Sequence, residues 1–187
     1  MSTHRKYFFD TIRSSLFGSL AQSQVDGLNL FLDWYDTSNP PIPDRYHLDD
    51  RMFAYVLATT YHETGATFQP IKEYGSDSYL KSKPYYPWYG RGYVQLTWKD
   101  NYQTQDTKLS LNGRLMANPD LALDPEIALD VILGSMCDGD FTGKKLSDYF
   151  TDQLTDWVDA RRIVNGTDRA QDIANYAMQF VDAITQT

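Results

Sequence analysis

The chain has 187 residues, of which 42% are hydrophobic, 14% aromatic and 22% charged, a composition that excludes a disordered or collagen-like chain. At roughly 100–200 residues per domain, this length predicts one domain over residues 1–187. Seventeen Lys and Arg against 25 Asp and Glu leave a formal charge of −8. A net negative charge repels the phosphate backbone of nucleic acids, so we expect no nucleic-acid partner.

The N-terminus and the cysteine content bear on where the protein is made. Asp10 interrupts what would be the apolar core of a signal peptide, and no run approaches the roughly 18 apolar residues of a membrane span. The single Cys137 cannot form an internal disulfide, as in a protein kept in a reducing cytosol. We therefore expect synthesis in the cytoplasm without a signal peptide, and no stable membrane association.

Two helical patterns occupy the N-terminal part of the chain, residues 1–45, and the proline-rich segment 39–43 ends them. Their apolar positions are Phe8, Ile12 and Leu16 in the first, and Val25, Leu28, Leu32 and Tyr35 in the second. A third helix is predicted from an N-cap at Asp49 or Asp50 to about His62, ending near Gly65.

The remaining core, residues 46–187, contains a segment of different character. Residues 65–118 are rich in Gly, Pro, Tyr and Ser and lack a helical period, which predicts loops around a small sheet, with a strand over 93–98. Helices are predicted again from an N-cap at Asp124, over 154–164, and from a cap at Asp168 with the inward positions Ile173, Tyr176, Ala177, Phe180, Val181 and Ile184. The predicted fold class is therefore mainly α, with a small irregular β-sheet or hairpin.

Glu63 is the first candidate for chemistry, because it follows His62 at the end of a largely apolar helix and lies close to Gly65. A partly desolvated carboxyl group at such a place keeps a proton near neutral pH, which a general acid requires. The alternative is an ordinary solvated glutamate at a helix end.

Glu73 is the next carboxylate, ten residues further on. Gly65 and Pro70 break the helix between the two glutamates, so the chain can fold back and oppose them. Inverting glycoside hydrolysis needs such a pair, at a separation of about 6.5–9.5 Å. Asp77 is a rival for the second role, and a surface loop of solvated acids is the alternative.

The segment 88–98 carries polar side chains among glycines and aromatics. As a strand it would turn Tyr93, Gln95 and Thr97 to one face, where Gln95 and Thr97 could bind a sugar or the attacking water. The glycines beside Arg91 would allow a ligand close to the backbone, although a structural hairpin explains them equally well.

Taken together, these segments resemble the family 19 glycoside hydrolases, the chitinase-like branch of the lysozyme superfamily, and especially its phage and prophage lysins. The blocks that carry the resemblance lie in the family's order over about residues 45–180: His62-Glu63, Glu73, Tyr89–Trp98, Asn118–Leu121, Phe141–Leu146 and Arg161–Gly166. The resemblance implies a lysozyme-like α+β catalytic domain with a cleft, and no cofactor.

The resemblance also implies roles for individual residues. Glu63 would be the general acid, Glu73 the general base, and Thr97 the hydroxyl that helps to position water. Substrate-binding roles would fall to His62, Tyr89, Arg91, Gln95, Trp98, Asn101 and Asn165, with Arg162 as the basic residue that supports the cleft.

Two departures from the plant chitinases bear on the substrate. The two glutamates are much closer in sequence, which resembles the lysin branch, and Asp100 stands where chitinases usually carry a sugar-stacking Tyr. We therefore expect a monomeric endolysin, made in an infected bacterium, that cleaves β-1,4 bonds of peptidoglycan as a muramidase after release to the wall.

Three alternatives remain open at this point. They are a chitinase, a non-catalytic wall-binding module and a metal-dependent amidase. The amidase is the least favoured, because His4, His47, His62 and Cys137 lack metal-site spacing, so no metal is expected.

Overall fold

The computed structural model describes residues 3–37, 46 and 48–185, so the predicted helix stop at 39–43 lies outside it. The chain begins with α1 (Thr3–Ile12), a π-helical turn η1 (Arg13–Phe17) and α2 (Gln22–Thr37). Gly27 of α2 lies directly against the backbone of Phe68, because a Cβ at this position would be 2.1 Å from the Phe68 carbonyl oxygen. This close approach joins α2 to the chain that follows the third helix.

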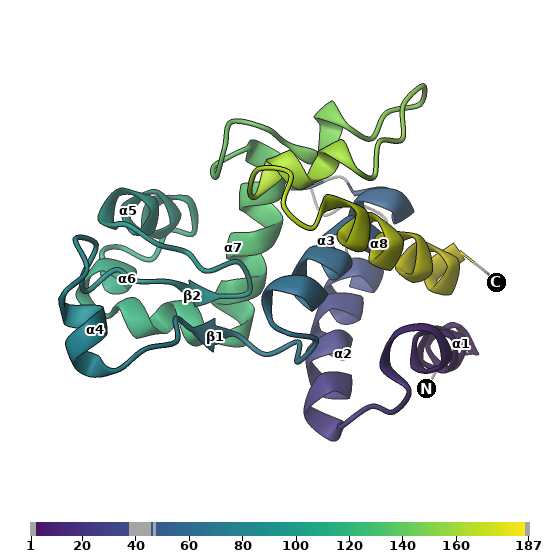
Figure 1. Ribbon diagram of the computed structural model, residues 1–187, viewed down its shortest axis with the longest axis horizontal. Helices are drawn as coiled ribbons and strands as arrows, with labels where there is room; N and C mark the ends of the chain where they lie inside the picture. Colours follow the sequence, from purple (N-terminus) through teal and green to yellow (C-terminus); the bar gives the residue numbers. More distant parts are fainter. Residues whose placement is uncertain (1–2, 38–45, 47, 186–187) are drawn as a thin grey trace.

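Helix α3 (Asp50–Glu63) forms the centre of the core, with every residue from Phe53 to Thr60 buried. The Asp49 side chain accepts a hydrogen bond from the Met52 N–H at 2.9 Å, which confirms the predicted N-cap. Glu63 is the last residue of this helix. The terminal helix α8 (Ala170–Thr185) packs along α3 (Figure 1).

The predicted buried face of α8 is confirmed in part. Ile173, Ala177 and Phe180 are buried, whereas the other three predicted positions, Tyr176, Val181 and Ile184, are only partly buried. The helix begins at Ala170, two residues after the predicted cap Asp168.

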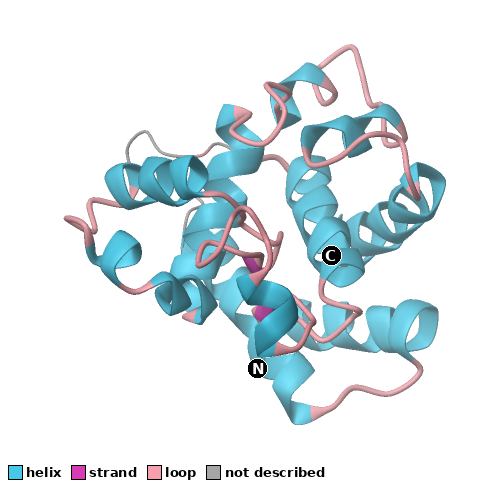
Figure 2. Cartoon of the chain, turned by 60° about the vertical axis from the view of Figure 1, so that its left-hand side comes forward, coloured by secondary structure: helices cyan, strands magenta, loops and turns pink. Residues whose placement is uncertain are grey.

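The middle of the chain holds a two-stranded antiparallel sheet, made of β1 (Ile71–Lys72) and β2 (Arg91–Gly92). Ile71 lies opposite Gly92, and Lys72 opposite Arg91. Helices dominate the rest, so the predicted mainly helical fold class with a small sheet is confirmed (Figure 2).

Two predictions for this middle segment are wrong. The strand expected over 93–98 is absent, because the chain turns after Gly92 and Leu96 pairs back with Arg91. Helices that the sequence did not indicate are also present, namely α4 (Asp77–Lys81), α5 (Lys99–Lys108) and α6 (Arg114–Ala117). The longest, α5, buries only Tyr102, Gln105 and Asp106, so it carries no apolar period to recognise.

In the C-terminal half, helical elements lie where the sequence predicts them. Asp124 caps α7 (Pro125–Asp138) by accepting the N–H groups of Glu126 and Ile127, as predicted. The helix expected over 154–164 is shorter than predicted and is the 3-10 helix η4 (Asp159–Ile163). Two further 3-10 helices are η2 (Pro119–Leu123) and η3 (Leu146–Asp148).

Helix α7 lies between two groups of elements, with α1, α2, α3 and α8 on one side and β1, β2, α4, α5 and α6 on the other (Figure 1). The chain passes from the first group to the sheet directly after α3, between Glu63 and the start of β1 at Ile71. Within the described ranges, no helix is long and apolar enough to cross a bilayer.

Candidate active site

Glu63 is held by a buried arginine. Its side chain is 19% exposed, and Oε1 accepts a hydrogen bond from Nη1 of Arg161 at 2.7 Å. Arg161 belongs to η4, is only 3% exposed, and donates from Nε to the Asp168 carbonyl at 3.1 Å. The 3-10 helix thus brings a fixed positive charge to the end of α3, where a charge-assisted hydrogen bond orients the carboxylate.

The neighbouring arginine lies elsewhere, which corrects a prediction. Arg162, expected to support the cleft, is half exposed and pairs with Asp159 at 3.1 Å. Successive residues of a 3-10 helix point about 120° apart, so only one of two adjacent arginines can face Glu63. The role predicted for Arg162 therefore suits its neighbour Arg161, which lies in the same sequence block and contacts Glu63.

Glu73 follows β1 and is held at both carboxylate oxygens. The Tyr85 hydroxyl donates to Oε1 at 2.8 Å, and the Gly90 N–H donates to Oε2 at 3.0 Å. The Glu73 N–H in turn donates to the Gly90 carbonyl at 2.7 Å, so both backbone and side chain fix this residue against the turn before β2. Asp77, the rival candidate, is exposed in the first turn of α4.

Gln95, Thr97 and Asn101 form a linked polar group after β2. Gln95 has a positive φ of 55° and donates from Nε2 to the Ile71 carbonyl at 3.1 Å, which ties the turn to β1. Thr97 Oγ1 donates to the Gln95 carbonyl at 2.7 Å, and Asn101 Nδ2 donates to the Thr97 carbonyl at 2.8 Å. The Thr97 hydroxyl oxygen can still accept a hydrogen bond, as a residue that positions water must.

Trp98 is the exposed aromatic residue of this region. Its side chain is 51% exposed, and its ring packs edge-to-face against Tyr85 with centroids 5.2 Å apart. Since Tyr85 is the residue that binds Glu73, a flat apolar surface lies next to the second carboxylate. Such a surface can stack on the face of a sugar ring.

Two residues predicted to contact substrate are part of the scaffold instead. Arg91 is 3% exposed, and its Nη1 donates to the carbonyls of Pro87 and Tyr89 and to the Tyr102 hydroxyl, each at 3.0 Å. Its Nε pairs with Asp120 at 2.7 Å. Tyr89 is 7% exposed, and the Arg91 guanidinium lies 3.7 Å from its ring centroid. Burial of both side chains supports the turn and leaves little surface for a ligand.

The last two predicted residues are on the periphery of these contacts. His62 is half-buried in the last turn of α3, beside Glu63. Asn165 is exposed, and its Oδ1 accepts the Gly166 N–H at 2.8 Å. His62 is related to Glu63 as its neighbour in sequence. Asn165 follows η4, the 3-10 helix that carries Arg161.

Sequence reasoning missed two residues that hold the glutamates, Arg161 and Tyr85. Arg161 lies in the last matched block, Arg161–Gly166, and Tyr85 lies in the aromatic run 85–89, whose rings suit sugar stacking and hydrophobic packing equally. Only the folded chain shows which glutamate each one reaches.

Metal and thiol chemistry have little support from the described side chains. No group of three or more His, Cys, Asp or Glu is placed to hold a metal ion there, and His47 lies outside the described residues. Burial raises the pKa of the Cys137 thiol to about 12, so this residue is a poor nucleophile at neutral pH.

Comparison with solved structures finds similarity over nearly the whole chain. Chitinase C from Streptomyces griseus HUT6037 matches with a TM-score of 0.63 and 24% identity, over 97% of this chain and 76% of the other. A bacterial family 19 chitinase, described as differing from plant enzymes, matches with the same TM-score and 22% identity, over 97% of this chain and 94% of the other. This chain has the fold of these chitinases.

The chitinase fold agrees with the resemblance drawn from the sequence. No protein-family model matches the chain, and the search of curated proteins finds no relative. At this level of identity the comparison establishes the fold, and the function has to be argued from the site itself.

Proposed function

We propose that the protein is a glycoside hydrolase that cleaves β-1,4 bonds of N-acetylhexosamine polymers with inversion. The observation that carries the proposal is the pair Glu63 and Glu73, each held by its own hydrogen bonds, in a chain with a chitinase fold. Glycosidases of this class need two such carboxyl groups, one protonated and one ionised.

Glu63 is the proposed general acid. Arg161 contacts only Oε1, so the proton would reside on Oε2 and pass to the glycosidic oxygen as the bond to the anomeric carbon breaks. Arg161 would fix the carboxyl group in a single orientation during this transfer.

Glu73 is the proposed general base. Its carboxylate accepts hydrogen bonds from Tyr85 and Gly90, an environment that suits the ionised form of a base. It would take a proton from a water that attacks the anomeric carbon from the opposite face, while the Thr97 hydroxyl holds that water. Gln95 and Asn101 would bind the sugar, and Trp98 would stack on it.

Peptidoglycan is the proposed substrate. The short spacing between Glu63 and Glu73 and the presence of Asp100 at the usual position of a sugar-stacking Tyr both support a lysin over a plant-like chitinase. We further propose a monomeric endolysin of phage origin, made in the bacterial cytoplasm, that acts on the wall after release.

Hydrolysis of purified peptidoglycan by the wild-type protein and by Glu63→Gln tests the proposal. The amide cannot donate a proton as an acid does, so the variant should lose activity by about 100-fold or more. It should stay folded, because the amide oxygen can still accept the hydrogen bond from Arg161, but with a lower melting temperature, because the buried Arg161 loses its ionised partner. Mass spectrometry of the released muropeptides should show a new reducing end at a sugar. Undiminished cleavage by Glu63→Gln, or a product of amide cleavage, would refute the glycosidase.

Chitin is the second candidate substrate, because the similar solved structures are chitinases. Reducing ends released from chitin oligomers and from peptidoglycan, measured side by side, distinguish the two substrates. Binding to either glycan without any bond cleavage would instead indicate a non-catalytic module.

A further inference from the structure

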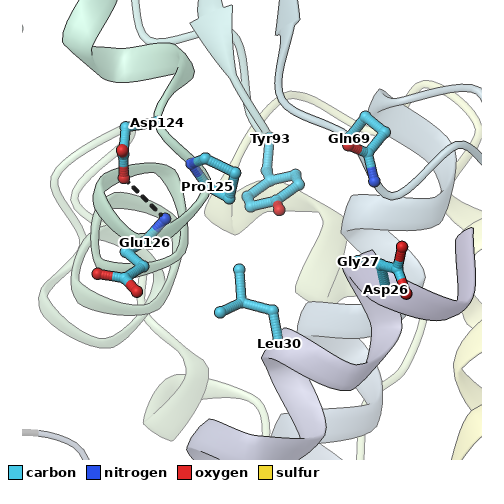
Figure 3. Close-up of a pocket in the computed structure, with 8 residues that line it drawn as sticks. All are labelled: Asp26, Gly27, Leu30, Gln69, Tyr93, Asp124, Pro125 and Glu126. Atoms are coloured by element: carbon cyan, nitrogen blue, oxygen red, sulfur yellow. Dashed lines mark hydrogen bonds between the residues drawn. The ribbon is translucent and has the colours of Figure 1, made fainter. Parts of the chain in front are cut away.

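Charge is unevenly distributed over this acidic chain. The described residues that line the pocket between α2 and the start of α7 include three acidic ones, Asp26, Asp124 and Glu126, and no basic one (Figure 3). The segment 71–99 is basic instead, because its five Lys and Arg against two Asp and Glu leave a charge of +3. Glu73 therefore lies in a locally basic part of a chain whose formal charge is −8.

Lys83 holds its ammonium group in a defined place in this basic segment. Its backbone is fixed after α4, because its N–H donates to the Leu80 carbonyl and its carbonyl accepts the Tyr86 N–H, both at 3.1 Å. The ammonium is exposed to solvent and lies 3.9 Å from the ring centroid of Tyr79. This cation–π contact limits the freedom that Lys83 would lose on binding a ligand. The contact is made by the ring, so a phenylalanine at position 79 would keep it.

The charge of Lys83 lies beside the residues that hold the proposed base. The hydrogen bond to Glu73 raises the pKa of the Tyr85 hydroxyl, and the positive charge of Lys83 opposes this shift. The charges of Lys83 and Glu73 also interact. Both oxygens of Glu73 already accept hydrogen bonds from uncharged donors, and no carboxylate of the described residues forms an ion pair with Lys83. Lys83 can therefore bind an anion of the substrate next to Glu73.

Lys72 offers a comparison within the same segment. Its ammonium also lies over a tyrosine, 5.2 Å from the ring centroid of Tyr89, and the residue is exposed. Lys72 directly precedes Glu73, and successive residues of an extended chain point to opposite sides. The carboxylates whose charges act most on Lys72 are Asp120 and Asp77. Lys72 thus matches Lys83 in charge and in ring contact but differs from it in position.

We propose that Lys83 is a specificity-determining residue that binds a carboxylate on the peptide substituent of a peptidoglycan strand. The inference rests on the proposed function and names the feature by which the site separates peptidoglycan from chitin. The N-acetyl groups of chitin are neutral, whereas the peptides of peptidoglycan carry free carboxylates. The Lys83 ammonium donates a charge-assisted hydrogen bond to such a carboxylate while the sugar lies against Glu73. The contact is short-range, so it acts after the approach to the wall.

Binding of soluble glycans to the Glu63→Gln protein tests the proposal separately from hydrolysis. The ligands are a peptidoglycan tetrasaccharide with its peptides and the same molecule with every carboxylate converted to an amide. Both are titrated calorimetrically at about 150 mM salt, where a Debye length of about 8 Å screens the net charge of the protein. We expect the amidated ligand to bind about two- to fivefold more weakly, as for an exposed ion pair.

Lysine variants in the same background locate this preference. Lys83→Gln should abolish it, so that the two ligands bind equally, whereas the matched control Lys72→Gln should retain it. The proposal is overturned if the parent protein does not prefer the charged ligand, or if the preference survives in Lys83→Gln. An equal loss in both lysine variants would mean that the ligand follows net charge alone, which also overturns it.

Steady-state kinetics of the otherwise wild-type protein gives a second measurement. The carboxylate takes no part in bond cleavage, so its contact stabilises the bound substrate and the transition state equally. Lys83→Gln should therefore raise KM for the charged tetrasaccharide about two- to fivefold, with kcat within twofold and with both constants on a chitin tetramer unchanged. A lower kcat on both substrates would mean that Lys83 acts on the ionisation of Glu73, which contradicts the proposal. Absence of hydrolysis by the wild type would refute the proposed hydrolase, while the binding comparison still decides the role of Lys83.

Discussion

At the scale of single residues, the two candidate carboxylates are held in different ways. Glu63 has one charged partner, Arg161, which comes from a helix almost a hundred positions away in sequence. Glu73 has two uncharged donors, Tyr85 and Gly90, both from the turn before β2. The two sets of contacts can therefore be removed independently by substitution.

Tyr85→Phe removes the hydroxyl that donates to Glu73 and keeps the ring that packs against Trp98. Because the base would lose one of its two orienting bonds, we expect kcat to fall about tenfold, with KM within twofold of wild type. Steady-state kinetics on soluble muropeptide or chitin oligomers measures both constants. Tyr79→Phe, the same change at an exposed tyrosine, should leave them unchanged, and an equal loss in both variants would contradict the role of Tyr85.

Arg161→Met and Arg162→Met form a matched pair that separates the buried arginine from its exposed neighbour. Arg161→Met deprives Glu63 of its charge-assisted hydrogen bond and should lower the free energy of unfolding by about 1–3 kcal/mol and the activity at least tenfold. Arg162→Met breaks only an exposed pair and should change stability by less than about 0.5 kcal/mol. Urea unfolding and hydrolysis assays on both variants measure these effects; similar results for the two would contradict the assignment.

At the scale of elements, the sequence predicted those helices that carry a buried stripe or a clear cap. Asp49 and Asp124 mark the starts of α3 and α7, and both accept backbone N–H groups as capping residues do. Helix α5 was not predicted, because its stability comes from a few buried polar contacts. An example is Gln105, whose Nε2 donates to Ser135 at 3.0 Å. Such contacts join segments that are remote in sequence and leave no local pattern.

The candidate site likewise combines residues that a local motif indicates with contacts between remote segments that no local motif indicates. Glu63, Glu73 and the polar residues after β2 could be found from ordered motifs, whereas the partners of the glutamates could not. Arg91 was misassigned for a related reason: a glycine-flanked arginine suits a ligand site and a buried scaffold equally until its burial is known.

The cap of α3 gives a prediction with a defined pH dependence. Burial opposes ionisation of Asp49, but the hydrogen bonds from Arg51 and from the Met52 N–H outweigh it and hold the pKa of Asp49 below its usual 3.8. Asp49→Ala should therefore cost about 1 kcal/mol at neutral pH.

The part of this cost that depends on the ionised carboxylate is fully present above the unfolded-state pKa and should disappear as the pH falls through the lower value of the folded state, whereas the neutral carboxyl group still accepts a hydrogen bond as Asn does. Thermal unfolding of the wild type and Asp49→Ala between pH 2.5 and pH 7, values set around the usual pKa of about 4, measures the difference. Asp49→Asn keeps an acceptor without the charge and is the control. A cost that persists undiminished at the acid end would contradict the assignment.

At the scale of the whole molecule, the formal charge of −8 opposes adhesion to an anionic bacterial wall. The catalytic proposal therefore requires that specificity come from the site, with repulsion acting on the approach to the substrate. This repulsion acts over long distances at low salt. At an ionic strength of 0.1 M it is largely screened beyond a separation of about 10 Å.

Raising the salt concentration from about 10 mM to about 150 mM should accordingly increase the rate of peptidoglycan hydrolysis, because it screens like charges. Neutral chitin oligomers serve as the control substrate, and their hydrolysis should change little. A rate on peptidoglycan that falls with salt would show that local attraction outweighs the net charge.

The burial of Arg91 decides how a pH profile of this protein can be interpreted. A guanidinium stays charged throughout the working pH range, and three of its partners are the two carbonyls and the Tyr102 hydroxyl. Burial raises the pKa of Tyr102 to about 12, so none of these three bonds changes ionisation between mildly acidic and mildly alkaline solution. Three of the four hydrogen bonds that hold the Arg91 guanidinium therefore do not depend on pH in this range, and the fourth is the ion pair with the Asp120 carboxylate. Loss of activity on the alkaline side of a pH optimum can then be attributed to the reacting groups, because a carboxylate is ionised there and the contacts of Arg91 stay unchanged.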